Sequence, residues 1–187
     1  MNTPSVDSPF AALLATQLTL GLPVELVALT PTYVPQMAQL ESLAHSHPMS
    51  EGNLADCFGH LYRVLGLKLS AGSDANTDAA SDPDSVDGLL GFAIVQQIVD
   101  EVTLLDICLL PSQQGKGYGK LLLNAVVASA KASAAVVLML EVRESNLAAR
   151  ALYQKAGFIE SGRRKGYYPI AGGKEDAILM DLAITQE

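Results

Sequence analysis

The sequence predicts an α/β domain built on one central mixed sheet, antiparallel at first and parallel in the middle, with helices on both faces. Strand-like segments at 61–69 and 89–99 are joined by a polar stretch, which favours an antiparallel hairpin. The segment 135–142, AVVLMLEV, is an unbroken apolar run, which is typical of a parallel strand covered on both faces. A chain of 187 residues that is 49% hydrophobic and 17% charged is large enough for one such domain.

The domain is expected to begin with a strand at 24–29, VELVAL. Thr30 and Pro31 then start a helix over 32–46, because proline is favoured in the first helical turn. A second, short helix is expected to begin near Ser50. The longer helix is expected to bury one side, formed by Met37, Leu40, Leu43 and Ala44.

Two segments fall outside this pattern. Residues 1–23 form an N-terminal extension before the domain at 24–187, and its apolar part is shorter than a membrane span. This extension is either a short helix that packs on the domain or on a partner, or it is disordered. Residues 70–88 contain five aspartates and almost no apolar side chains, so burial cannot offset their ordering entropy. They are expected to form a disordered acidic loop inserted between two strands.

The second half alternates strands and helices. A strand at 101–110, a helix at 117–131 and the strand at 135–142 form a βαβ unit. A further helix begins at Ser145 or Asn146 and ends before Gly157, which stands where a C-terminal cap belongs. Strands at 158–164 and 175–184 complete the chain. The first helix is expected to bury Tyr118, Leu121, Leu122, Ala125 and Val126, and the second Ala148, Ala149, Leu152, Tyr153 and Ala156.

The charge and the cysteine content exclude several classes of protein. The net charge is −8 and the pI is near 4.8, so no broad phosphate-neutralising surface is expected, and a basic polypeptide is a better partner than nucleic acid. No membrane span or basic secretory segment is expected, which favours a cytoplasmic, reducing setting. Both cysteines are expected to be small buried side chains. No metal is expected, because the spacing of His45, His47, Cys57 and His60 does not make a closed zinc set.

The stretch QQGKGYGK, residues 113–120, joins a strand to a helix. A glycine-rich turn at a helix N-terminus exposes several backbone N–H groups, which is typical of an anion site and most often of a phosphate site. The stretch matches neither the P-loop pattern nor the dinucleotide fingerprint. Taken alone, it fits a structural tight turn as well as an anion site.

The neighbouring motifs add to this signal. The turn Q-x-x-G-x-G (Gln114, Gly117, Gly119) is followed by a strand that ends in LEVRESN and by a helix that carries ALYQKAGF. This order resembles the GNAT family of acetyl-CoA-dependent N-acetyltransferases, over about residues 24–184 and most strongly from 102 onward. The resemblance implies that acetyl-CoA is the cosubstrate. It implies cofactor contacts through the backbone of Ile107, Cys108 and Leu109, through Asn146, and through the turn formed by Gln114, Gly115, Lys116, Gly117, Tyr118, Gly119 and Lys120.

Within the family, the pattern LEVRxSNxxAxxLYxxxGF, followed by Arg163-Arg164, YYP and EDAIxM, resembles the branch that acetylates the N-terminal alanine of a small-subunit ribosomal protein. This resemblance implies a basic ribosomal protein N-terminus as the partner. The chain departs from the branch in its N-terminal extension, in the acidic insertion, in Gly115-Lys116 within the turn, and in Met49, where relatives usually have an aromatic residue.

The same resemblance implies that Glu141 is the general base and Tyr153 the general acid. The residues alone favour a different interpretation, in which Glu141 is a strand-end glutamate paired with Arg143 or Arg163 and Tyr153 is a core tyrosine. Asn146 can be a helix cap without a ligand. Two alternative functions share the fold. One is acetylation of another protein or of a small amine, and the other is a non-catalytic acyl-CoA-binding module.

Overall fold

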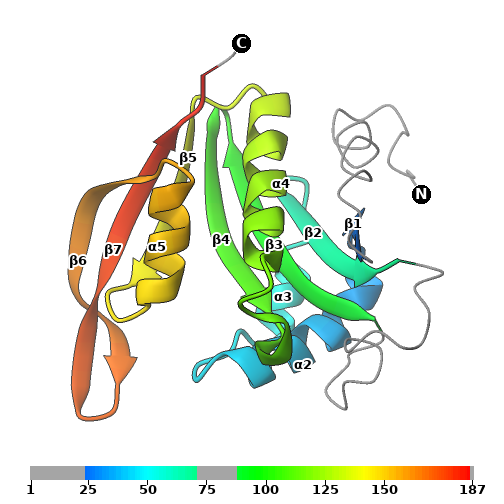
Figure 1. Cartoon of the computed structure of the whole chain (residues 1–187), viewed down its shortest axis with the longest axis horizontal. Coiled ribbons are helices and arrows are strands. Elements are labelled where there is room, and N and C mark those ends of the chain that lie inside the picture. Colours follow the sequence, from blue (N-terminus) through cyan, green and yellow to red (C-terminus); the bar gives the residue numbers. More distant parts are fainter. Residues whose placement is uncertain (1–23, 71–87, 186–187) are drawn as a thin grey trace.

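The structure, a computed structural model, describes residues 24–70 and 88–185 and contains a seven-stranded sheet in the order β1-β2-β3-β4-β5-β7-β6 (Figure 1). β4 and β5 are parallel, and the other neighbouring strands are antiparallel, so the predicted mixed sheet is confirmed. The N-terminal extension and all of the acidic loop except its end residues lie outside the described residues. The strands are β1 Val24–Ala28, β2 Tyr62–Leu69, β3 Leu89–Ile98, β4 Glu101–Leu109, β5 Val137–Arg143, β6 Ile159–Ile170 and β7 Gly173–Ala183.

Helices cover both faces of the sheet, as the sequence predicted. In Figure 1, α4 and α5 lie on the near face, and α2 and α3 lie on the far face. Ser50 caps α3 through its hydroxyl, which accepts a hydrogen bond from the N–H of Asn53, and Asn146 caps α5 by accepting from Ala149. The helices are α2 Val34–Ala44, α3 Glu51–Asp56, α4 Tyr118–Ala132 and α5 Leu147–Lys155, with 3₁₀ turns at Pro31–Tyr33 and Pro111–Gln113.

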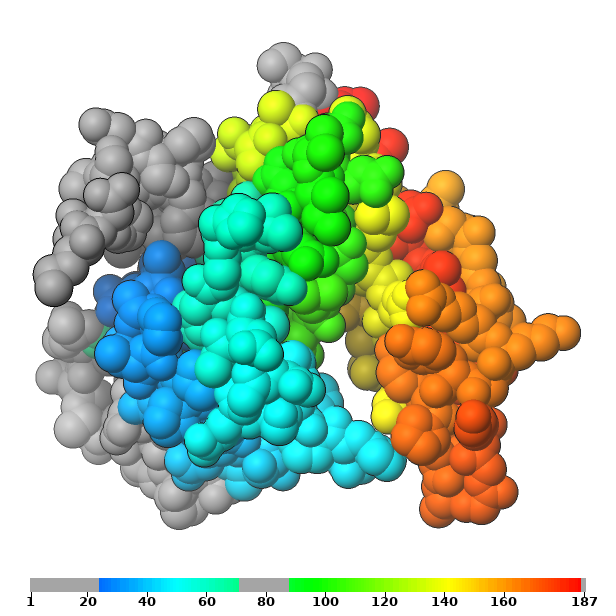
Figure 2. Space-filling model, turned by 180° about the vertical axis from the view of Figure 1, so that it is seen from behind, coloured from blue at the N-terminus to red at the C-terminus, as the bar shows by residue number. Residues whose placement is uncertain are grey.

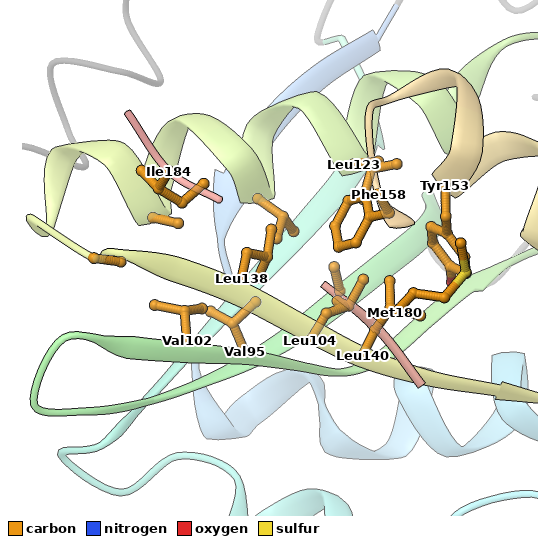
Figure 3. Packing of buried hydrophobic residues seen from close by; sticks show 14 of the residues in the cluster. Val95, Val102, Leu104, Leu123, Leu138, Leu140, Tyr153, Phe158, Met180 and Ile184 are labelled. Atoms are coloured by element: carbon orange, nitrogen blue, oxygen red, sulfur yellow. The ribbon is translucent and has the colours of Figure 1, made fainter. Parts of the chain in front are cut away.

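The core is divided into two clusters by β3. Phe92 and Ile94 belong to the cluster that contains the buried apolar side chains of α2 and α3, whereas Ala93 and Val95 belong to the cluster that contains Leu123, Ala125, Val126 and Ala130 of α4. Alternate residues of a strand point to opposite faces, so a central strand with helices on both sides is apolar at every position. Figure 3 shows the second cluster.

β5 differs from its prediction as a strand covered on both faces. Leu138, Leu140 and Val142 are buried, but Met139 and Glu141 between them are only half-buried. One face of β5 packs into the second core cluster, whereas Glu141 lines a cavity. The apolar run therefore correctly predicted a strand, but the prediction that both faces of this strand are covered was wrong.

Two helical side chains differ from their predictions, and a third position holds a buried charge for which no prediction was made. Leu43 of α2 is 39% exposed, whereas Glu41, two residues earlier, is 2% exposed. Ala148, predicted on the buried side of α5, is exposed. A charged residue inside an amphipathic helix is normally read as its solvated side, which is why the sequence did not indicate that Glu41 is buried.

Gly91 on β3 sets how closely β3 and β4 approach. A Cβ added to Gly91 would lie 2.6 Å from the carbonyl oxygen of Cys108 and 2.4 Å from Leu109 Cδ2. We expect Gly91→Ala to lower the free energy of unfolding by about 1–3 kcal/mol, because the backbone of β4 has to move. Denaturant unfolding measures this change.

Gly52→Ala in α3 is the matched control, because its Cβ would meet no atom closer than Ser50 Oγ at 3.9 Å. There the free energy of unfolding should rise by up to about 1 kcal/mol, since alanine favours helix over glycine. Equal effects of the two substitutions would contradict the close approach at Gly91.

Candidate active site

The two parallel strands separate halfway along their length. Their pairing ends at Leu104 opposite Leu140, although β4 continues to Leu109 and β5 to Arg143. Just beyond that point β4 carries a bulge, because Ile94 of β3 faces Asp106 and Val95 faces Leu104, which leaves Leu105 as an extra residue. The end of β4 is therefore open on the side of β5.

The bulge also reverses which side chains of β4 face each helix layer. Val102 and Leu104 belong to the cluster on the α4 side, whereas Cys108 belongs to the cluster on the α2 side, although all three are even-numbered. Asp106 accordingly faces Glu41 of α2. Two carboxyl groups that are far apart in the sequence thus lie together beside the separated strands.

A cavity of about 210 Å³ lies where the strands separate. Figure 2 shows this hollow between the segment that contains α2 and α3 and the yellow and orange segment that contains the end of β5 and β6. The cavity brings together four residues predicted from the sequence: Ile107, Glu141, Asn146 and Tyr153. It adds Glu41 and Asp106, which the sequence did not indicate, together with His45 and His47, which were weighed only as metal ligands, and Tyr168 of the YYP segment.

Glu141 is positioned by an ion pair that the sequence did not predict. Its Oε1 lies 2.8 Å from Arg164 Nη2, with 27% of the glutamate side chain exposed. The expected partners, Arg143 and Arg163, pair with Glu175 and Glu144 instead. The antiparallel pairing of β6 and β7 decides this choice, because it sets which arginine of β6 can reach across β7 to Glu141 of β5.

Tyr153 belongs both to the core and to the cavity, so its place in the core does not remove it from the site. The residue is 5% exposed, and its ring lies 5.7 Å from that of Phe158. Figure 3 shows both rings at one end of the core cluster, with Met180 beside Tyr153. Burial, and to a lesser extent the charge of Asp106, raises the pKa of the Tyr153 phenol above its usual 10.0. At neutral pH the group is therefore a hydrogen-bond and proton donor.

The glycine-rich turn takes up left-handed backbone at two positions. Gly115 has φ 76° and Gly117 has φ 88°, and a Cβ at either position would meet no atom within 4 Å. Gly117 is the N-cap of α4 and offers no side-chain acceptor to the first N–H groups of the helix. A Cβ at Gly119 would make ordinary van der Waals contact, at 3.5 Å from both Leu109 Cδ1 and Leu152 Cδ2.

The polar residues of this turn form hydrogen bonds within the turn and to the end of β4. Gln114 Nε2 donates to the carbonyl of Leu109 at 3.4 Å, and Lys116 Nζ donates to Gln113 Oε1 at 3.2 Å. Lys120 is exposed, and Tyr118 is buried in the first core cluster. The turn and the first turn of α4 thus present backbone N–H groups and two lysines beside the open end of β4, an arrangement that suits phosphate.

Three metal-ligating groups approach one another near the cavity. Atoms of Glu41, His45 and Cys108 that could bind a metal lie within 4.8 Å of each other. Of the four residues weighed as metal ligands in the sequence analysis, only His45 belongs to this group. Burial raises the pKa of the Cys108 thiol, and the backbone N–H of Met49 already donates to Glu41 Oε2 at 2.9 Å. We assign no metal to these residues.

Comparisons with known proteins agree with this geometry. A sequence profile of the Acetyltransferase (GNAT) family matches residues 69–158. The ribosomal protein bS18 alanine N-acetyltransferase of Salmonella typhimurium is 40% identical over 157 residues, which cover 84% of this chain and 95% of that protein. The chain belongs to the GNAT family of acetyltransferases.

Two further relatives support the assignment of the chain to this family of acetyltransferases. The enzyme of the same name from Haemophilus influenzae is 41% identical over 146 residues, 78% of this chain and 88% of that protein. The crystal structure of the ribosomal protein S18 alanine N-acetyltransferase from Escherichia coli superimposes with a TM-score of 0.75 at 34% identity, covering 88% of this chain and 96% of that one. Among the described residues, no helix is long and apolar enough to cross a membrane.

Asp106 makes the stability of the acetyltransferase depend on pH. Burial, the charge of Glu41 and a hydrogen bond to Glu41 raise the pKa of Asp106 well above its usual 3.8. Above about pH 4, the native state therefore holds a proton that the unfolded state has released. The free energy of unfolding of the wild type is expected to fall as pH rises from about 4 toward neutral and above, by up to about 1.4 kcal/mol per pH unit. Asp106→Asn should lack this loss, as measured by denaturant unfolding across pH. If the free energy of unfolding falls equally with pH in both proteins, Asp106 is not the cause of the pH dependence.

Proposed function

We propose that the protein transfers the acetyl group of acetyl-CoA to the α-amine of the N-terminal alanine of ribosomal protein bS18. The observation that carries this proposal is the similarity, over most of the chain, to proteins named for that activity. The geometry supports it, because an acid candidate and a base candidate line one cavity at the open ends of two parallel strands. A cytoplasmic location, where ribosomal proteins are made, follows from the proposal.

Acetyl-CoA fits the open end of β4. In the proposal, the backbone of Ile107, Cys108 and Leu109 binds the pantetheine amides, as an added strand would, because β5 leaves this edge of β4 unpaired. Residues 114–120 bind the pyrophosphate through the N–H groups of the turn and through Lys116 and Lys120. Asn146 donates to the cofactor through its side-chain amide nitrogen, because its Oδ1 already accepts the N–H of Ala149.

Glu141 is proposed as the general base, acting through water. A protein N-terminal amine has a pKa of about 7.7–8.0, so only a modest proton acceptor is needed to supply the neutral nucleophile. The guanidinium of Arg164 holds the Glu141 carboxylate in place at 2.8 Å, and the exposure of the arginine leaves the pair open to water. The proton passes from the amine to the water-linked carboxylate.

Tyr153 is proposed as the general acid. The attack on the acetyl carbonyl breaks the bond to sulfur, and the leaving thiolate of coenzyme A takes a proton. The Tyr153 phenol lines the same cavity as Glu141 and is protonated at neutral pH. A buried phenol also donates without competition from bulk water, which strengthens the hydrogen bond to the developing thiolate.

The walls of the cavity suit a basic peptide. Three carboxyl groups, those of Glu41, Asp106 and Glu141, line it. Tyr168 of β6 closes one side, where the guanidinium of Arg143 lies 4.3 Å from its ring centre. Carboxyl groups around a cavity attract a positively charged chain end and repel an acidic one.

The substrate is tested with two peptides that match the N-terminus of bS18. One begins with a free alanine, and the other has the same sequence with a blocked amine and an internal lysine. With acetyl-CoA and the purified protein, we expect a mass gain of one acetyl group on the free-alanine peptide alone. Acetylation of the internal lysine would contradict the proposal. So would a lack of acetylation of both peptides by a protein that still binds acetyl-CoA. Either result would favour one of the two alternative functions.

The catalytic roles are tested by Glu141→Gln and Tyr153→Phe, which keep the shape of each side chain. We expect each to lower kcat by about a hundredfold or more, because each removes a proton-transfer group. Glu160→Gln and Tyr167→Phe are matched controls on exposed side chains of β6. If either site variant folds normally and turns over as fast as its control, the role assigned to that residue is wrong.

A further inference from the structure

The carboxyl groups of Glu41 and Asp106 form a buried pair at the floor of the cavity, and the roles proposed above do not use them. Glu41 is 2% exposed. Glu41 Oε1 and Asp106 Oδ2 are both buried, and neither makes a hydrogen bond to the described residues, although His45 Nε2 lies 3.5 Å from Glu41 Oε1. Buried polar atoms without a partner cost stability, so the pair requires an explanation beyond packing.

A single shared proton accounts for both unpartnered oxygens. Two ionised carboxylates side by side repel each other, whereas one proton between them provides a donor and leaves one negative charge. The side chains of Asp106 and Glu41 approach within hydrogen-bonding reach. Burial, followed by the charge of Glu41, raises the pKa of Asp106, in agreement with a retained proton.

Glu41 also holds the loop between α2 and α3, residues 45–50. Its Oε2 accepts the backbone N–H of Met49 at 2.9 Å, and its Oε1 lies 3.5 Å from His45 Nε2. His45, His47 and Met49 of this loop line the cavity. Glu41 therefore links β4, through Asp106, to a loop that forms one wall of the site.

We propose that Glu41 and Asp106 share one proton and act as positioning residues that fasten the loop at 45–50 to β4, so that the cavity accepts the first residues of the substrate peptide. This inference rests on the proposed function for the identity of the peptide. The shared proton and the fastened loop do not depend on it. At high pH the pair loses its proton, the two anions repel, and the loop is released.

Other ionisable groups surround the pair on every neighbouring element and titrate in the same experiment. They are His45 and His47 of the loop, Cys57 after α3, Cys108 on β4, Glu141 and Arg143 on β5, Tyr153 on α5 and Tyr168 on β6. The pair is isolated from them by comparing the wild type with variants that differ only at Glu41 or Asp106.

The first test is the pH dependence of the peptide KM between about pH 6 and pH 9, measured by acetyl transfer. Asp106→Asn and Glu41→Gln each replace the shared proton by a permanent amide donor and keep one negative charge. The ratio of the wild-type KM to that of either variant cancels the titration of the peptide amine. We expect this ratio to rise by about tenfold toward high pH, and a ratio that stays constant overturns the shared proton.

Glu51→Gln is the matched control, because it removes one exposed carboxylate beside the same loop. Its KM should follow the pH dependence of the wild type. If it instead follows that of Asp106→Asn, the effect is one of overall charge, and the proposal fails.

The second test concerns the loop. Glu41→Ala removes the acceptor for Met49, and we expect the peptide KM to rise by about tenfold or more while kcat and the acetyl-CoA KM change little. A fall in kcat at an unchanged peptide KM contradicts a positioning role. If Glu41→Ala does not fold, Glu41→Gln decides the question by the pH test, because its amide keeps both contacts.

Two measurements that need no turnover separate this inference from the proposed function. Carbon-13 NMR of the carboxyl groups should show one protonated carboxyl at neutral pH in the wild type and none in Asp106→Asn. The amide hydrogen of Met49 should exchange faster in Glu41→Ala than in the wild type. If the wild type fails to acetylate the peptide but both NMR results hold, the substrate is wrong and the carboxyl pair stands, whereas failure of either result overturns it.

Discussion

The extra residue at Leu105 and the end of pairing between β4 and β5 are the constraint on which the site depends. Beyond Leu104 and Leu140 the two strands no longer share hydrogen bonds, and the bulge turns the following side chains of β4 toward α2. A regular parallel pair would satisfy its own backbone and bury the space between the strands. In this fold the backbone of β4 stays available to a ligand, and the cavity lies at the point of separation.

The three carboxyl groups of the cavity differ because their surroundings differ. Glu141 pairs with a half-exposed arginine, which keeps its carboxylate within reach of water. Asp106 is turned toward the interior and toward a second carboxyl group, which favours the neutral form. Groups of one chemical kind are thus directed to separate tasks, one to proton transfer and the others to positioning.

The β6–β7 hairpin supplies the opposite wall of the cavity, and ionic contacts hold it in place. Arg143 of β5 bonds to Glu175 at 2.8 Å and stacks on Tyr168, while Asp176 accepts the N–H of Gly166. Each exposed pair adds little stability, but together they orient a hairpin whose β6 is mostly exposed. Arg164 and Tyr168 of the RR…YYP segment therefore shape the site.

The sequence by itself determined the order and type of the elements, the glycine turn and the family, because local periodicity, caps and short motifs are written in neighbouring residues. It placed Glu141, Tyr153, Asn146 and Ile107 at one site. It missed the burial of Glu41, the partner of Glu141 and the pair formed with Asp106. Those features depend on strand register and on a bulge, which arise from contacts between segments far apart in the chain, so only the tertiary structure decided them.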